Sequence, residues 1–141
     1  MKPHFASRFR EIRHVPSAYS CQVFVASDEF LQQRDVVVKI FPARHFTYDL
    51  AQLTKGISRY RGLRHPHLAT ILDAGLTHKK EFFYVREYFT GPVAFSSENA
   101  ALLHALLNTA LFLYSTNAVH GGIKPSNLFT HDDSLRLVDP Q

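Results

Sequence analysis

The chain has a single cysteine, Cys21, no tryptophan and no long apolar run. One cysteine cannot form an internal disulfide, so we expect a reducing compartment. No stretch reaches the ~20 apolar residues that a helix needs to cross a bilayer. The first residues, Met1 to Ala6, lack the apolar segment of a secretory signal. These absences argue against a membrane or secreted protein, and a cytoplasmic location is the default expectation.

What is present is the composition of one modest globular domain. Of the 141 residues, 45% are hydrophobic and 20% are charged. The formal net charge is +4, from 16 Lys and Arg against 12 Asp and Glu, which raises the question of nucleic acid. No nucleic-acid motif accompanies the arginines, so we expect solvated basic faces and no specific nucleic acid. The histidines show no metal-ligand spacing.

Residues 1–91 carry the pattern of a small antiparallel sheet with one helix. Alternating or β-branched residues predict strands, and polar or proline-containing segments predict the turns between them. One of the strands is buried and contains a single lysine, Lys39. The predicted strands are Phe9–Val15, 23–26, 35–41, 69–76 and 81–89, and the helix covers about 47–61.

The remaining residues predict a long helix followed by a short hairpin. Residues 100–114 are apolar on nearly every face, and either Ser97 or Asn99 can cap the N-terminus of the helix. About 15 residues are too few to span a membrane, so we expect protein to bury this helix on more than one side. The hairpin that follows brings Lys124, Asn127 and Asp139 close together.

The sequence of this hairpin region resembles two protein kinase motifs. The residues concerned are Val119-His-Gly-Gly-Ile-Lys-Pro-Ser-Asn-Leu-Phe129 and then Val138-Asp139-Pro140-Gln141. The motifs are the catalytic loop H-R-D-L-K-P-x-N and the D-F-G segment. Earlier segments match in the same order: Lys39 falls in a strand similar to V-A-I-K, followed by His65-Pro66 and Glu87-Tyr88. The chain therefore resembles Ser/Thr protein kinases from about Phe9 to Asp139.

The resemblance implies an α+β fold in two parts. Residues 1–91 correspond to the kinase small lobe, a five-stranded antiparallel sheet plus one helix. Residues 92–141 correspond to a partial large lobe, with its central helix, catalytic loop and D-F-G-like segment. The implied cofactor is ATP with Mg²⁺, bound weakly or not at all: Lys39 and Lys124 would contact phosphate, and Asn127 and Asp139 would hold the metal. The other implied nucleotide-binding residues are Val23, Val37, Glu87, Phe89 and Phe129.

Several positions depart from the kinase pattern and weigh against catalysis. Gly121 and Gly122 follow His120 where the family has Arg and the catalytic Asp, and glycine cannot accept a proton. A positioned base contributes about 10²–10⁴ in rate. The glycines of the phosphate-binding loop are also replaced, at positions 16, 18 and 21. We therefore expect no catalytic residue, with Lys124 as a remnant.

Two cations are left without their family partners. The glutamate that pairs with the kinase lysine would stand at Gly56, and residues 51–60 contain no acid. Lys39 could reach water, pair with Asp139 or lose its proton, and pairing with Asp139 is the interpretation we prefer. Arg86 occupies a position that is usually apolar, so it must reach a carboxylate or point out of the cleft.

The sequence thus predicts a catalytically impaired, pseudokinase-like module that serves as a regulatory or protein-interaction domain. Its partner would be another protein or a second copy, bound through the apolar helix 100–114. Two alternatives stay open: an ATP-dependent protein Ser/Thr phosphotransferase, and the N-terminal fragment of a larger kinase-containing signalling protein. The residues that match the kinase motifs also have a purely structural interpretation. In it, Asn127 stabilises its loop by bonding backbone, Asp139 is the counter-ion of Lys39, and Phe129 is a core residue.

Overall fold

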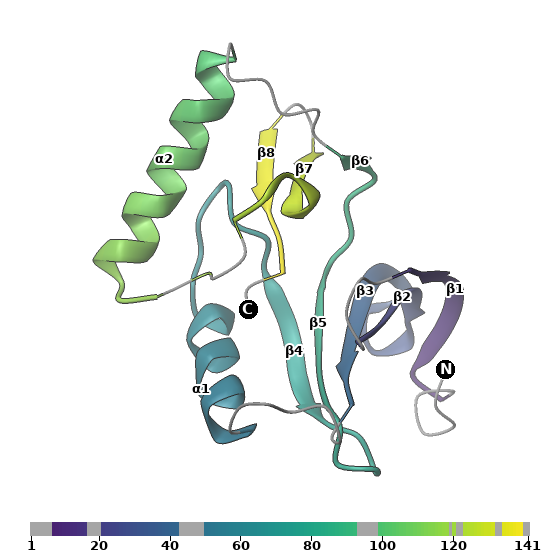
Figure 1. The fold of residues 1–141 in the computed structure, drawn as a ribbon. Helices are drawn as coiled ribbons and strands as arrows, with labels where there is room; N and C mark the ends of the chain where they lie inside the picture. Colours follow the sequence, from purple (N-terminus) through teal and green to yellow (C-terminus); the bar gives the residue numbers. More distant parts are fainter. Residues whose placement is uncertain are drawn as a thin grey trace. The chain divides into compact units, whose positions relative to one another are not determined.

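A computed structural model of the chain describes residues 7–16, 21–42, 50–92, 99–118, 120, 123–131 and 134–139 (Figure 1). Its internal contacts divide into two compact units. The first consists of Met1–Ile57 and Ile71–Tyr88, and the second of Ser58–Thr70 and Phe89–Gln141. The predicted α+β class is confirmed. No helix in the described part of the chain is long and apolar enough to cross a membrane.

The first unit contains the predicted five-stranded antiparallel sheet. Neighbouring strands follow the order β1-β2-β3-β5-β4. A short 3-10 helix, Glu29–Leu31, joins the second and third strands where a polar connection was predicted. The strands are β1 (Phe9–Val15), β2 (Gln22–Asp28), β3 (Arg34–Phe41), β4 (Ile71–Leu76) and β5 (Phe82–Glu87). All five coincide with predicted strands to within a few residues at each end.

The two faces of this sheet differ in chemistry because successive residues of a strand point to opposite sides. Val36, Val38 and Ile40 of β3 belong to a buried apolar cluster with residues of β1, β2 and β5. Burying each such side chain contributes about 1.5–3 kcal/mol. Val37 and Lys39 alternate with these residues and therefore lie on the opposite face.

Helix α1 spans Leu50–Arg61 and begins just after a segment, 43–49, that lies outside the described residues. It is continuous through Gly56, although glycine costs about 1 kcal/mol relative to alanine within a helix. Ile57 and Tyr60, three residues apart, are the buried apolar residues among those of α1 whose side chains the structure describes. The expected single helix between the third and fourth strands is therefore present.

The second unit contains the predicted hairpin as part of a three-stranded sheet. The strands are β6 (Gly91–Pro92), β7 (Leu128–His131) and β8 (Ser134–Leu137), in the order β6-β7-β8. The short strand β6 was not predicted. Segment 67–69 runs along β8: the Leu137 amide donates to the His67 carbonyl at 2.8 Å, and the Ala69 amide donates to the Leu137 carbonyl at 2.9 Å.

Helix α2, Ala100–Ser115, runs beside β8 (Figure 1). Asn99 is its N-cap, and the side-chain oxygen accepts from the Leu102 amide at 3.0 Å. The alternative cap Ser97 lies outside the described residues, as does segment 93–98 as a whole. The buried positions form a single stripe: Leu102, Ala105, Thr109 and Leu113.

The opposite side of α2 remains exposed. Leu107, Leu111 and Tyr114 are 63%, 65% and 83% exposed. The described elements of this chain do not bury the helix on more than one side, and its burial by a protein partner stays a prediction. The helix is apolar on nearly every face, but the described elements of its unit cover only one of them.

Candidate functional site

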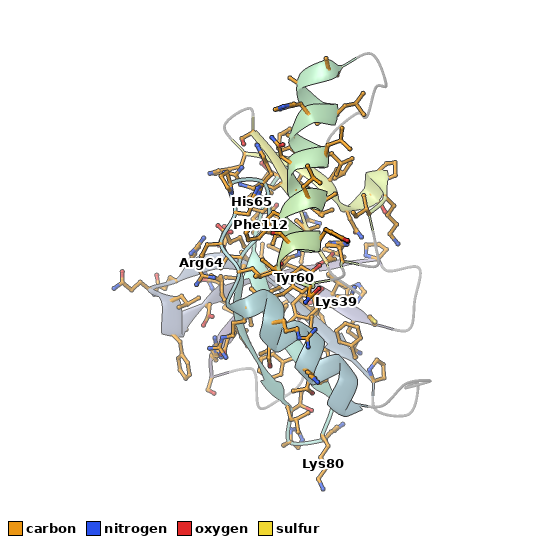
Figure 2. The ribbon with its side chains drawn as sticks, turned by 90° about the vertical axis from the view of Figure 1, so that its left-hand side faces the viewer. Lys39, Tyr60, Arg64, His65, Lys80 and Phe112 are labelled. Carbon is orange, nitrogen blue, oxygen red and sulfur yellow. The ribbon has the colours of Figure 1, made fainter. Side chains whose placement is uncertain are left out.

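Three predicted nucleotide-binding residues of the first unit share one face of its sheet. In the strand register, Lys39 lies opposite Val23 of β2 and Val37 lies opposite Val25. Val37 is buried, whereas Lys39 is half-buried (Figure 2). The Lys39 ammonium lies 5.3 Å from the centroid of the Phe41 ring, within the range of a cation–π interaction. The side-chain period of two places Val37 and Lys39 on one face of β3, and the register between β2 and β3 adds Val23 to that face.

The predicted partner of Lys39 is not tested by this arrangement. The side of α1 at Gly56 carries no carboxylate, and a Cβ added there would meet no atom within 4 Å. The preferred pairing joins Lys39 to Asp139, which belong to different units, and it stays a prediction.

Arg86, by contrast, is not directed to solvent. Arg86 is only 6% exposed, and its Nη1 donates to the Glu87 carbonyl at 2.9 Å. The Glu87 carboxylate accepts from Arg34 at 3.1 Å in an exposed ion pair, an interaction worth at most about 1 kcal/mol. The implied role of Glu87 in nucleotide binding stays a prediction.

The catalytic-loop-like segment of the second unit is organised around Val138. His120 is 2% exposed, and its Nε2 lies 2.8 Å from the Val138 carbonyl oxygen. A carbonyl oxygen can only accept, so Nε2 carries the proton. The Val138 amide in turn donates to the Asn127 carbonyl at 2.9 Å. Both backbone polar groups of Val138 are therefore held by residues of the motif.

The other two predicted residues of this segment are Asn127 and Asp139. Asn127 ends a 3-10 turn, Pro125–Asn127, and its amide donates to the Lys124 carbonyl at 2.9 Å. It is buried, while Asp139 follows Val138 with a left-handed φ of 57°. Only glycine adopts such a φ without cost, so the surrounding structure must hold Asp139 in place.

These residues offer a metal two oxygen-bearing side chains and no more. Mg²⁺ in phosphoryl-transfer sites is bound by one or two carboxylates, with phosphates and waters filling the other positions. No cluster of three or more His, Cys, Asp or Glu exists among the described residues. The metal-binding role of Asn127 and Asp139 stays a prediction, and it would require a nucleotide and waters to supply the other ligands. Gly121 and Gly122 lie outside the described residues, so the missing base is known from the sequence.

Phe89 and Phe129, two of the implied nucleotide-binding residues, belong to a small core. Phe89 is buried with Ala69 and Val138, and Phe129 packs against this cluster. The Phe89 ring also meets His131 at a centroid distance of 5.5 Å. A core role accounts for both rings without a ligand.

Tyr60 packs edge-on against His120, with ring centroids 6.0 Å apart and an interplanar angle of 76°. Its hydroxyl is buried and has no hydrogen-bond partner among the described residues. Burial raises the pKa of Tyr60 well above its usual value, so the ring stays neutral. It contributes apolar packing under the loop.

Sequence reasoning missed an ion cluster in the first unit. The Arg8 guanidinium donates to both oxygens of Asp28, at 3.0 and 2.9 Å, and to Asp73 at 2.7 Å. It also lies over the rings of Phe9 and Phe30, 4.6 and 4.8 Å from their centroids. Burial alone would lower the pKa of Arg8, but hydrogen bonds to the two carboxylates and their charges raise it overall. This cluster connects β2 with β4 and is structural.

Sequence reasoning also missed a cleft within the second unit. It has a volume of about 400 Å³ and lies between the first turns of α2 and the β7–β8 hairpin. His67 and His104 line it, and the His67 Nδ1 lies 3.0 Å from the Leu135 carbonyl oxygen. The spacing of the histidines gave no sign of this cleft, because they come from a loop and a helix that meet only in the folded unit.

A scan of the sequence against protein-family models finds no match. The likeness to protein kinases therefore rests on the residues quoted above, their order along the chain and the chemistry they could perform.

Proposed function

We propose that this chain is a degenerate kinase-like module that binds a protein partner and does not transfer phosphate. The observation that carries the proposal is that the catalytic-loop-like segment keeps its structural hydrogen bonds but has no side chain that could act as a base at the position of the catalytic aspartate. His120 and Asn127 hold both backbone groups of Val138, next to Asp139, yet the sequence has glycine where a base would stand. Such a segment keeps its structural residues and lacks the group that would deprotonate an acceptor.

The chemistry of phosphoryl transfer supports the loss of activity. Catalysis by this family depends on positioning the phosphates and stabilising their charge. Gly122 removes the base, and Gly56 removes the carboxylate that would orient Lys39. Both losses weaken the same phosphoryl-transfer step.

The exposed side of α2 supports a protein partner. Leu107, Leu111 and Tyr114 are spaced four and three residues apart, which aligns them along one side of a helix. The helix contains no Lys, Arg, Asp or Glu. Exposed aliphatic and aromatic side chains in a row are typical of interaction surfaces. The partner is another protein or a second copy of this chain.

Light scattering coupled to size exclusion tests this surface. We expect wild type to self-associate at high concentration or to bind its partner, and Leu111→Glu to abolish that binding while remaining folded. Asn108→Glu is the matched control, because it adds the same charge to an exposed position of the same helix. A clean monomer at millimolar concentration that Leu111→Glu leaves unchanged contradicts self-association. Equal effects of Leu111→Glu and Asn108→Glu contradict binding through the exposed side of α2.

Weak nucleotide-dependent phosphotransfer is the second candidate, favoured by Lys39, Asn127 and Asp139. A titration of ATP with Mg²⁺ against wild type, Lys39→Ala and Asp139→Ala distinguishes the two. Loss of binding in both variants supports a nucleotide site, and transfer of label to an acceptor supports catalysis. Absence of binding at millimolar nucleotide removes this candidate and leaves the binding module unaffected.

A further inference from the structure

The exposed side of α2 carries a regular row of side chains, which we call the α2 seam. Its members follow one another at steps of four, three, four and three residues, and all are exposed. They are Ala100, His104, Leu107, Leu111 and Tyr114. Two helices that pack along each other repeat their contact residues every 3.5 residues on average, which is the mean step of this row. At 3.6 residues per turn, the seam lies roughly 180° from the buried stripe of the same helix.

The helix that carries the seam is capped at both ends. The Asn99 side chain accepts from the Leu102 amide at 3.0 Å, and the Thr116 amide donates to the Phe112 carbonyl at 3.1 Å. The seam is therefore formed before any partner binds. Association does not have to order the helix, which removes one of the usual costs of binding.

The electrostatics of the seam favour a second copy of the chain. Helix α2 contains no Lys, Arg, Asp or Glu, so neither the seam nor its flanking residues Leu103, Asn108 and Ala110 carry a fixed charge. The whole chain has a net charge of +4, and two copies would repel each other if they met through basic surfaces. Two seams meet without like charges and without burying an unpaired charge. A strongly charged partner would have to bury its own charges unpaired.

The spacing of the seam is the same in both directions. From His104 to Tyr114 the steps are three, four and three residues. A two-fold axis midway between Leu107 and Leu111 therefore maps the row onto itself in an antiparallel pair. Leu107 then faces Leu111 of the second copy. By the same symmetry, His104 faces Tyr114 of the second copy. Symmetric dimers require a surface that is complementary to itself in this way.

A parallel pair of helices is less favourable. Each residue would then face its own counterpart, so the two His104 imidazoles would meet and would repel each other when protonated. The two helix dipoles would also point in the same direction, whereas in an antiparallel pair they oppose each other. In the antiparallel pair, His104 instead meets the phenol of Tyr114, which is neutral near pH 7.

We propose that the α2 seam binds a second copy of this chain in an antiparallel helix pair. The inference rests on the proposed interaction role of the exposed side of α2 and commits it to one partner. The row from His104 to Tyr114 is only about 15 Å long, and such a contact buries less than the ~800 Å² per partner of a stable complex. The dimer is therefore weak and reversible, with a dissociation constant above about 1 μM.

Disulfide trapping tests the antiparallel pair. Leu107→Cys and Leu111→Cys are made in a Cys21→Ser background, so that each protein contains one thiol. One of the two carries an isotope label, and the proteins are mixed in equal amounts at several hundred micromolar and oxidised. Mass spectrometry then separates mixed disulfides from same-variant disulfides. Lys79→Cys, on an exposed turn of the first unit, measures random collision, and circular dichroism verifies that all variants fold.

We expect mixed disulfides to form most of the linked product, against the half that random pairing gives. We also expect at least fivefold more linked product than with Lys79→Cys. A majority of same-variant disulfides would show a parallel pair and overturn the antiparallel arrangement. A random mixture, or no more linkage than with Lys79→Cys, would overturn binding of a second copy. The proposed interaction surface fails separately, when Leu111→Glu leaves the binding of every protein partner unchanged.

Discussion

His120 donates from Nε2 to the carbonyl oxygen of Val138, 2.8 Å away and 18 residues further along the chain. This bond joins the start of the catalytic-loop-like segment to the residue before Asp139. Val138 is 1% exposed, so its carbonyl has no water to replace a lost protein donor. The arrangement of the loop therefore depends on the imidazole.

We expect His120→Ala to lower the free energy of unfolding by about 3 kcal/mol, from an unsatisfied buried carbonyl and the cavity left by the ring. Urea denaturation monitored by circular dichroism measures this change. His104→Ala, at an exposed position of α2, is the control and should change stability by less than about 0.5 kcal/mol. Similar values for the two variants would contradict the structural role of His120.

Asp28→Ala should be more damaging than any change to the exposed ion pair. Asp28 is completely buried and accepts two hydrogen bonds from Arg8, which would be left partly uncompensated. Removing one partner of a buried pair costs about 3–5 kcal/mol. Glu87→Ala breaks the exposed pair with Arg34, in which the Arg34 side chain is 48% exposed, and the loss of this pair should cost less than about 1 kcal/mol. Chemical denaturation of both variants checks this ranking, and the reverse order would refute it.

Stability should fall as pH falls below neutrality, partly through His65. Burial, with a smaller contribution from the charge of His67, lowers the pKa of His65. The folded state therefore favours the neutral imidazole, which accepts from the His67 amide at 3.2 Å and stacks on Phe112 at 4.8 Å. This contribution to stability is present above the unfolded pKa of 6.5 and is lost as pH falls through the lower folded value.

Denaturation of wild type and His65→Gln between pH 5 and 8 tests this effect. The variant should show a flatter dependence of unfolding free energy on pH across that window. An unchanged pH profile would mean that His65 does not titrate differently in the folded and unfolded states.

Two glycines should respond to alanine in opposite directions. Gly56 lies within α1, and an added Cβ would meet nothing within 4 Å, so Gly56→Ala should stabilise by about 0.5–1 kcal/mol. A Cβ at Gly91 would lie 2.5 Å from the Thr130 Oγ1, which donates to the Gly91 carbonyl at 3.1 Å, so Gly91→Ala should destabilise. Thermal denaturation compares them. A destabilising Gly56→Ala would mean that the position is not an open helical site.

The sequence predicted the strands and helices well because each depends on neighbouring residues. Alternation places Val37 and Lys39 on the face opposite Val36 and Val38 whatever the rest of the chain does. For the candidate site, the sequence predicts that the hairpin brings Lys124, Asn127 and Asp139 close together, and in the structure the amide of Val138, the residue before Asp139, donates to the Asn127 carbonyl at 2.9 Å. The bond from His120 to Val138 was not predictable, because it requires the relative placement of two segments.

By itself, then, the sequence determined the α+β class, the five strands of the sheet, the long helix and the absence of a base at Gly122. Only the tertiary structure decided which side of α2 is buried, that Arg86 turns inward, and that Arg8 joins Asp28 to Asp73. The reason is that side-chain period is a local property of the backbone. Partners 20 and 65 residues apart, as in the Arg8 cluster, meet only once strand register and packing are fixed.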